Sequence, residues 1–181
     1  MYFPFFMNKC AIVFFPQQNV EEIQRFRIKF DPKSNLIAPH ITLVFPFPET
    51  ENSQIFIEEM SKKISKLNSF PIVLRGVKFD TDDNFLHFLV DEGKEKITDI
   101  HDDLYSGILE SYWRKDLPYN PHMTIGVFSN SANEFDEEKY SSAQGELELF
   151  ESPIALNFNN LNVIEISDSS MPRTILKRFS F

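Results

Sequence analysis

The feature that most constrains the fold is a doubled motif. Pro-His-x-Thr followed by an apolar run occurs as PHITLVF from Pro39 and as PHMTIGVF from Pro121, an offset of 82 residues. The same offset relates PIVL at Pro71 to PIAL at Pro153. Two matches in one register indicate an internal duplication. We therefore expect residues 1–181 to form a single bilobal domain with an internal repeat.

Hydrophobic patterning predicts a strand–helix–strand unit in each half. Asn19 with Glu22 has the spacing of a helix N-cap and its reciprocal glutamate, and DTDDN at 80–84 is typical of a hairpin turn. The expected helices are 19–30, 51–67, 94–109 and 134–145, and the expected strands are 9–15, 40–47, 71–79, 85–90, 122–128, 154–158, 162–166 and 174–181. The predicted class is α+β, with mostly antiparallel sheets, helices outside, a pseudo-two-fold axis and a central cleft.

The spacing within each motif places its polar residues together. Residues i and i+2 of a strand point to the same face, so His40 shares a face with Thr42 and His122 shares one with Thr124. The intervening apolar residues face the core. If the duplicated lobes pack about a two-fold axis, the two polar faces meet in one groove.

Two imidazoles and two hydroxyls around one point suit phosphate ester chemistry. Histidine can accept or donate a proton near neutral pH, and each such transfer contributes about 10²–10⁴-fold in rate. Threonine hydroxyls can donate hydrogen bonds to the oxygens where negative charge accumulates. No metal ligand and no cofactor is predicted.

These two PHxT strands, their spacing and the chain length resemble the two-histidine phosphoesterase superfamily, also called 2′-5′ RNA ligase-like or cyclic phosphodiesterase proteins. The resemblance covers nearly the whole chain. It implies metal-independent hydrolysis of 2′,3′-cyclic phosphates or 2′-5′ linkages in RNA ends or nucleotides, with 2′-5′ RNA ligation as the reverse direction. It implies that His40 and His122 are the acid and base, in an order the motif leaves open, and that Thr42 and Thr124 hold the phosphate.

Four further residues are candidates for substrate binding. Trp113 and Arg114 precede the second motif, where an aromatic ring beside a cation could stack a base and attract a phosphate. Tyr119 lies nearer the motif, and Arg173 precedes the last expected strand. The alternative for Trp113 is that it packs beneath the loop while the neighbouring cations are solvated.

The remaining histidines have structural interpretations. His87 in FLHFLV lacks a partner hydroxyl, so we expect it to fill a sheet position. His101 lies in the acidic segment IHDDLY and is expected to face solvent. Metal binding by this HDD run is disfavoured because adjacent helix residues point in different directions.

The acidic charge of the chain limits the kinds of ligand that it can bind. The net charge is −9 and the pI is near 4.9, whereas a protein that grips long nucleic acid needs a broad basic surface. A short RNA end or a cyclic nucleotide is the expected ligand, and we expect a monomer.

Cys10 is the only cysteine, which excludes an intrachain disulfide. The apolar start is too short to span a membrane, so the cytoplasm is expected; Met7 offers an alternative start.

Two other functions remain open at this level. The same fold could bind RNA ends or nucleotides without turnover. A metal-dependent phosphohydrolase could use the histidines as ligands, but it would need nearby carboxylates that neither motif supplies.

Overall fold

The computed structural model describes residues 8–48, 53–167 and 170–181. The alternative start at Met7 and the first two residues of the expected helix 51–67 lie outside these ranges. In chain order the elements are β1 (Lys9–Phe14), α1 (Glu21–Phe30), β2 (Ile41–Pro48), α2 (Ser53–Ile64), β3 (Phe70–Asp80), β4 (Phe85–Glu92), α3 (Lys94–Tyr105), the 3₁₀ helix η1 (Gly107–Tyr112), β5 (His122–Val127), α4 (Glu137–Gln144), the 3₁₀ helix η2 (Leu147–Phe150), β6 (Ile154–Phe158), β7 (Asn160–Ile166) and β8 (Thr174–Ser180).

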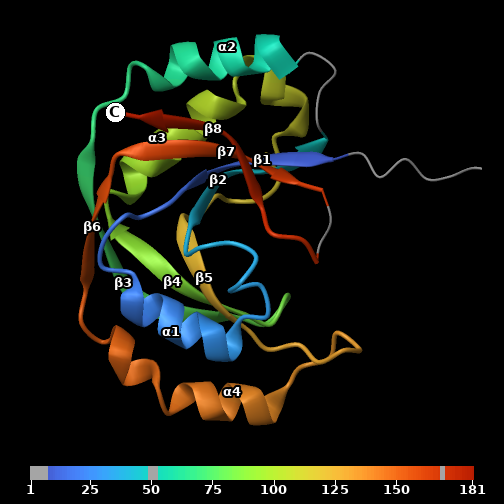
Figure 1. Ribbon diagram of the computed structural model, residues 1–181. Helices are drawn as coiled ribbons and strands as arrows, with labels where there is room; N and C mark the ends of the chain where they lie inside the picture. The colour runs from blue at the N-terminus through green and yellow to red at the C-terminus, as the bar shows by residue number, and fades with distance from the viewer. Residues whose placement is uncertain (1–7, 49–52, 168–169) are drawn as a thin grey trace, which may run out of the picture.

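The described strands form one antiparallel sheet of eight strands in the order β6-β3-β4-β5-β2-β1-β7-β8. The two motif strands, β5 and β2, are neighbours at its centre, where Ile41 pairs with Met123. Figure 1 shows α1 and α4 at one end of the molecule and α2 and α3 at the other. The predicted α+β class, with antiparallel strands and outer helices, is confirmed.

The two halves of the sequence interlock across this centre. β3 follows the first motif strand in the chain but pairs with β4, and β7 follows the second motif strand but pairs with β1. The helices cross over in the same way, because α1 packs against β5 and α3 packs against β2. Each side of the central β5–β2 pair therefore contains elements from both halves of the sequence.

The strand order shows that one of the two sequence matches at the 82-residue offset, PIVL with PIAL, does not reflect the internal duplication. The segments PIVL and PIAL are direct neighbours in the sheet, since Ile72 pairs with Leu156 and Leu74 pairs with Ile154. Counting outward from the central β5–β2 pair, β3 and β7 are each the third strand, so β7 and not β6 corresponds to β3. The offset of 82 residues relates the two motif strands but not these two segments.

All four helices differ from the sequence prediction in at least one boundary: α2 ends at Ile64 instead of residue 67, α4 spans Glu137–Gln144 instead of 134–145, and the remaining two differences have a visible backbone cause. Asn19 is not the N-cap of α1: its φ is 60°, its side chain donates to Ala155 O at 2.9 Å, and the cap position is Val20. The helix expected at 94–109 ends at Tyr105, because its C-cap Ser106 is extended, with a ψ of 145°, and Gly107 then begins η1 with a φ of 81°. A positive φ is easily reached by glycine and cannot continue an α-helix.

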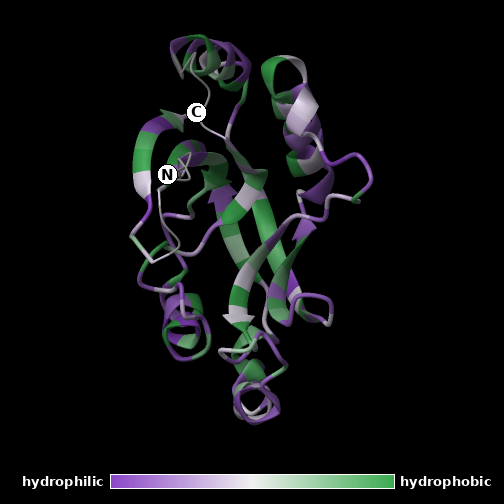
Figure 2. Cartoon of the chain, turned by 90° about the vertical axis from the view of Figure 1, so that its right-hand side faces the viewer, coloured by the Kyte–Doolittle hydropathy of each residue, from purple (hydrophilic) through white to green (hydrophobic). Residues whose placement is uncertain are grey.

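Most buried apolar side chains form one large core, which includes Ile41 and Met123 of the two motif strands, and Ala11, Val13 and Ile164 form a second, small cluster. Figure 2 shows hydrophobic segments along the strands and long hydrophilic stretches on the helices at the two ends. Ile41 and Met123 are fully buried, so the centre of the sheet is anchored on its core face. No helix among the described residues has the length and apolarity needed to cross a bilayer.

Candidate active site

The register at the centre of the sheet brings the two motifs together. Because Ile41 lies opposite Met123, continuing the antiparallel register places His40 opposite Thr124 and Thr42 opposite His122. Ile41 and Met123 point into the core, so the four flanking side chains share the other face. Ile41–Met123 is the single pair recorded between β2 and β5 among the described residues, so the two histidines flank the point where the strands meet. His122 also acts electrostatically on His40, which is consistent with two rings that face one site.

Both motif histidines make the same local hydrogen bond. His40 Nδ1 lies 2.9 Å from Ala38 O, and His122 Nδ1 lies 2.7 Å from Asn120 O, in each case the carbonyl two residues earlier. A carbonyl oxygen only accepts, so each Nδ1 carries the hydrogen. In the neutral ring, Nε2 then keeps its lone pair and can exchange a proton with a substrate.

Burial makes both rings weaker bases than free histidine. The His40 side chain keeps partial exposure, yet its pKa is lowered to about 4, chiefly by desolvation; the hydrogen bond to Ala38 opposes the shift and the charge of Arg27 adds to it. Desolvation also lowers the pKa of His122, and this is opposed by its hydrogen bond to Asn120 and by the carboxyl group of Asp83. A bound phosphate would raise both pKa values, because an anion favours the charged imidazolium.

A buried ion pair supports the loop that leads to His40. Arg27 Nε and Nη2 both donate to Asp31 Oδ2, at 3.0 and 2.7 Å, and the two side chains are 1% and 4% exposed. The other oxygen, Asp31 Oδ1, accepts the backbone N–H of Lys33 at 2.8 Å. The end of α1 is thereby tied to the start of the 31–39 loop.

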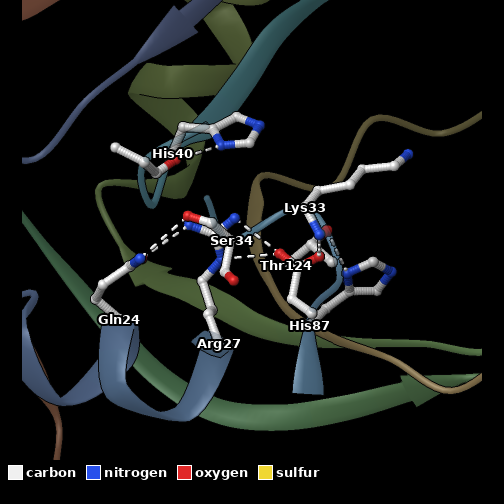
Figure 3. Close-up of polar contacts among 9 residues, drawn as sticks. Gln24, Arg27, Lys33, Ser34, His40, His87 and Thr124 are labelled. Carbon is white, nitrogen blue, oxygen red and sulfur yellow. Dashed lines mark hydrogen bonds and ion pairs between the residues drawn. The ribbon is translucent and has the colours of Figure 1, made fainter. Parts of the chain in front are cut away.

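Two more hydrogen bonds extend this support. Arg27 Nη1 donates to Gln24 Oε1 at 3.2 Å, and Gln24 Nε2 donates to Ser34 O at 3.1 Å. Figure 3 shows these residues together with His40 and with the pair His87–Thr124. Since α1 packs against β5, the helix that holds the first motif's loop rests on the strand of the second motif.

A third histidine lies at this site, which the sequence did not predict. His87 on β4 pairs with Thr124 in the register, and its ring centroid is 3.9 Å from that of His122. Its Nδ1 lies 3.3 Å from Thr124 Oγ1. His87 does occupy a sheet position, as expected; its own strand supplies no partner hydroxyl, but the neighbouring strand β5 does. Desolvation, and then His122, lower its pKa to about 4.

A cavity of about 410 Å³ opens beside His122 and His87. Aromatic and apolar side chains form much of its wall, and two cations, Lys78 and Arg114, also line it. The remaining lining residues are Phe45, Asp80, Leu89, His101, Tyr105, Trp113, Leu117, Pro118, Tyr119 and Asn120. A cavity lined mostly by apolar and aromatic side chains, with a few polar groups among them, suits an organic ligand that carries a charged group.

His101 is buried and not solvent-facing, which corrects the sequence interpretation. It is 3% exposed, and its Nδ1 donates to Leu43 O at 2.6 Å. Its ring stacks on Tyr119 with centroids 3.7 Å apart and planes at 5°. The Tyr119 hydroxyl donates to Thr42 O at 2.8 Å, so this stack supports the first motif strand while it lines the cavity.

Trp113 and Arg114, which the sequence predicted as substrate-binding residues, also line the cavity. Trp113 stacks on Tyr105 with centroids 5.9 Å apart, and Lys115 Nζ lies 4.7 Å from the Trp113 ring centroid. Arg114 is exposed and lies 3.5 Å from Asp116. Such an exposed pair is weak, so the guanidinium is available to a ligand.

Arg173 lies elsewhere. Its backbone N–H donates to Leu36 O at 2.9 Å and its Nη1 donates to Met171 O at 3.0 Å. Arg173 is absent from the described residues that line the cavity. The structure therefore brings Trp113, Arg114 and Tyr119 to the cavity with the second motif, but not Arg173.

The carboxylates that the motifs lack come from the β3–β4 hairpin. Ligand atoms of Asp80, Asp83 and His87 all lie within 4.8 Å of one another, a spacing that would admit a cation. Each aspartate also accepts a backbone N–H of the hairpin at 3.0 Å, which accounts for its position by turn chemistry. Lys78 lies directly across from His87 in the register and brings a positive charge to the same row. We therefore assign no metal ligand here.

Comparisons with known proteins agree with this geometry. The sequence profile of the 2′-5′ RNA ligase superfamily matches residues 15–169. A relative in Bacillus licheniformis is 28% identical over 144 residues, covering 78% of this chain and 80% of its own length. One in Bacillus cereus is 31% identical over 132 residues, covering 71% and 74%. Both bear the name "Putative phosphoesterase".

Among solved structures, Escherichia coli LigT has the same fold. Its complex with 3′-AMP superposes with a TM-score of 0.61 at 14% identity, covering 96% of this chain and 98% of that one. Its complex with phosphate gives a TM-score of 0.56 at 13% identity, covering 96% of each chain.

Proposed function

Because the chain belongs to the 2′-5′ RNA ligase superfamily, we propose that it is a phosphoesterase that opens 2′,3′-cyclic phosphodiesters, or cleaves 2′-5′ linkages, in short RNA ends or nucleotides. His40 and His122 act as general base and general acid. Thr42 and Thr124 donate hydrogen bonds to the non-bridging phosphate oxygens.

The observation that carries this proposal is the matched pair of Nδ1 hydrogen bonds to Ala38 O and Asn120 O. They fix both rings by the same local device, where two strands that meet at the centre of the sheet begin. Each ring then offers its Nε2 for proton transfer. One ring can thus act on the attacking oxygen and the other on the departing oxygen of a single phosphate.

The roles follow from the surroundings of the two rings. His40, with a pKa of about 4 and Arg27 among its neighbours, is neutral and takes the proton of the attacking water. His122, whose pKa is supported by Asp83 and Asp80, holds a proton more readily once the phosphate anion is bound. Water oxygen bonds to phosphorus, the bond to the ribose 3′ oxygen breaks, and His122 protonates that oxygen. A 2′-phosphate remains, and proton exchange with solvent restores both rings.

The cavity beside His122 receives the rest of the substrate. Its volume of about 410 Å³ falls in the range of ligand pockets, roughly 300–1,000 Å³. Its aromatic wall suits a nucleoside, and Lys78 and Arg114 suit an adjacent phosphate. The net charge of −9 disfavours long nucleic acid, and a short RNA end or a single nucleotide remains as the substrate.

The direct test is hydrolysis of 2′,3′-cyclic nucleotides with the product identified by ³¹P NMR. We expect a 2′-phosphate product from the wild type, loss of nearly all activity in His40→Ala and in His122→Ala, and unchanged activity in the exposed control Glu95→Gln. Wild-type activity in either histidine variant would refute the proposed mechanism.

The low pKa values favour one alternative function. A site whose histidines are neutral at pH 7 lacks a proton donor until an anion binds, and a protein that only recognises RNA ends needs no proton donor. Such a protein would bind 2′-AMP saturably in a calorimetric titration, form no product from cyclic substrates, and show changed affinity in the histidine variants.

A further inference from the structure

We propose that His87 is a positioning residue for the second motif, which holds the side chain of Thr124 for phosphate binding. The inference rests on the proposed function, because it assigns Thr124 to the phosphate. It goes beyond that function by adding a third histidine and by making the two motifs unequal.

The inequality follows from the sheet register. In the second motif, Thr124 pairs with His87 on the neighbouring strand β4. In the first motif, the corresponding Thr42 pairs with Val13 on the neighbouring strand β1. An imidazole therefore stands beside one threonine hydroxyl, and an apolar isopropyl group stands beside the other. Thr42 cannot receive the same support from its neighbour.

His87 is itself held firmly in place. It is 7% exposed, its ring lies against His122 at 3.9 Å, and Phe85 on the same strand packs at 6.1 Å. Its Nδ1 contacts Thr124 Oγ1 at 3.3 Å. A threonine has three staggered χ1 rotamers, and a hydrogen bond to a fixed ring selects the one that keeps the hydroxyl at the His87 ring.

The charged groups around His87 come from one hairpin and one strand. Asp80 and Lys78 on β3 act on it electrostatically, Asp83 of the turn has a carboxylate oxygen within 4.8 Å of a His87 ring nitrogen, and His122 faces it on β5. With its pKa lowered to about 4, His87 is neutral at pH 7. It therefore acts on Thr124 as a neutral hydrogen-bond donor, with Nδ1–H directed at Oγ1, and the hydroxyl hydrogen of Thr124 stays available for the phosphate.

A double-mutant cycle on hydrolysis of a 2′,3′-cyclic nucleotide tests the pair. We expect His87→Leu to lower kcat by about tenfold, less than the ~10²–10³-fold typical of losing a direct oxyanion donor, with little change in KM. The same substitution should have no further effect in a Thr124→Val background and its full effect in a Thr42→Val background. His87→Asn, whose side-chain amide can reach the Nδ1 position, should recover most of the loss.

A second measurement, of the Thr124 side-chain rotamer, tests the proposal without relying on enzyme activity. Three-bond couplings to the threonine methyl carbons report χ1 populations, and we expect a single rotamer for Thr124 in the wild type and averaging in His87→Leu, with Thr42 unchanged in both. If the wild type hydrolyses no cyclic nucleotide, the proposed function fails while these couplings still decide the His87–Thr124 contact. Additive effects of His87→Leu and Thr124→Val, or an unchanged Thr124 rotamer, would overturn the inference.

Discussion

Acidification should destabilise this protein through its buried histidines, and His87 allows the effect to be measured at one residue. Its pKa falls from an ordinary 6.5 to about 4 on folding, and its side chain is 7% exposed. Between these values the unfolded chain binds a proton that the folded chain does not. Stability is therefore fully present above pH 6.5 and is lost as the pH falls toward 4.

The magnitude follows from proton linkage. Between pH 7.5 and pH 5.0, a histidine with these two pKa values costs about 2 kcal/mol of the free energy of unfolding. Urea unfolding, followed by the fluorescence of Trp113, the single tryptophan, gives that free energy at each pH. The wild type should lose more than 2 kcal/mol, because the pKa of His40 is also lowered to about 4.

The decisive comparison is with His87→Asn, which cannot titrate in this range. It should lose about 2 kcal/mol less than the wild type between the two pH values. Thr81→Asn, an exposed change in the same hairpin, should lose as much as the wild type. If His87→Asn and the wild type lose the same amount within about 0.5 kcal/mol, the reasoning that burial holds His87 neutral is refuted.

Three further predictions concern the active site and its support. The pH profile of cyclic nucleotide hydrolysis should be bell-shaped, rising as His40 loses its proton and falling as His122 loses its own; a profile flat from pH 5 to 9 would contradict acid–base catalysis. Hydrolysis should survive treatment with EDTA followed by gel filtration, whereas loss of activity restored by one divalent metal would favour metal-dependent chemistry. Asp31→Asn should destabilise the protein by about 3–5 kcal/mol in urea unfolding, because it leaves the charge of Arg27 buried without its partner; the control Arg25→Gln breaks an exposed pair and should cost less than about 1 kcal/mol.

Much of the fold could be predicted because its signals are local. Alternating apolar residues identified the motif strands, and the turn residues at 80–84 identified the hairpin between β3 and β4. The helix boundaries at Asn19 and at Gly107 were misjudged, since a cap sequence and a glycine each allow more than one backbone conformation. The repeat of PIVL was misread because similar apolar strands occur both at equivalent positions and at neighbouring ones.

At the active site too, local sequence patterns predicted some features and the tertiary structure decided the others. Strand periodicity is a property of the backbone, so the sequence by itself determined that His40 shares a face with Thr42 and that His122 shares one with Thr124. Only the tertiary structure decided that β4 lies beside β5, which brings His87 from 37 residues away to Thr124, and that His101 turns inward to stack on Tyr119. Strand order and helix packing depend on which apolar faces meet across the whole chain, and no local pattern records that choice.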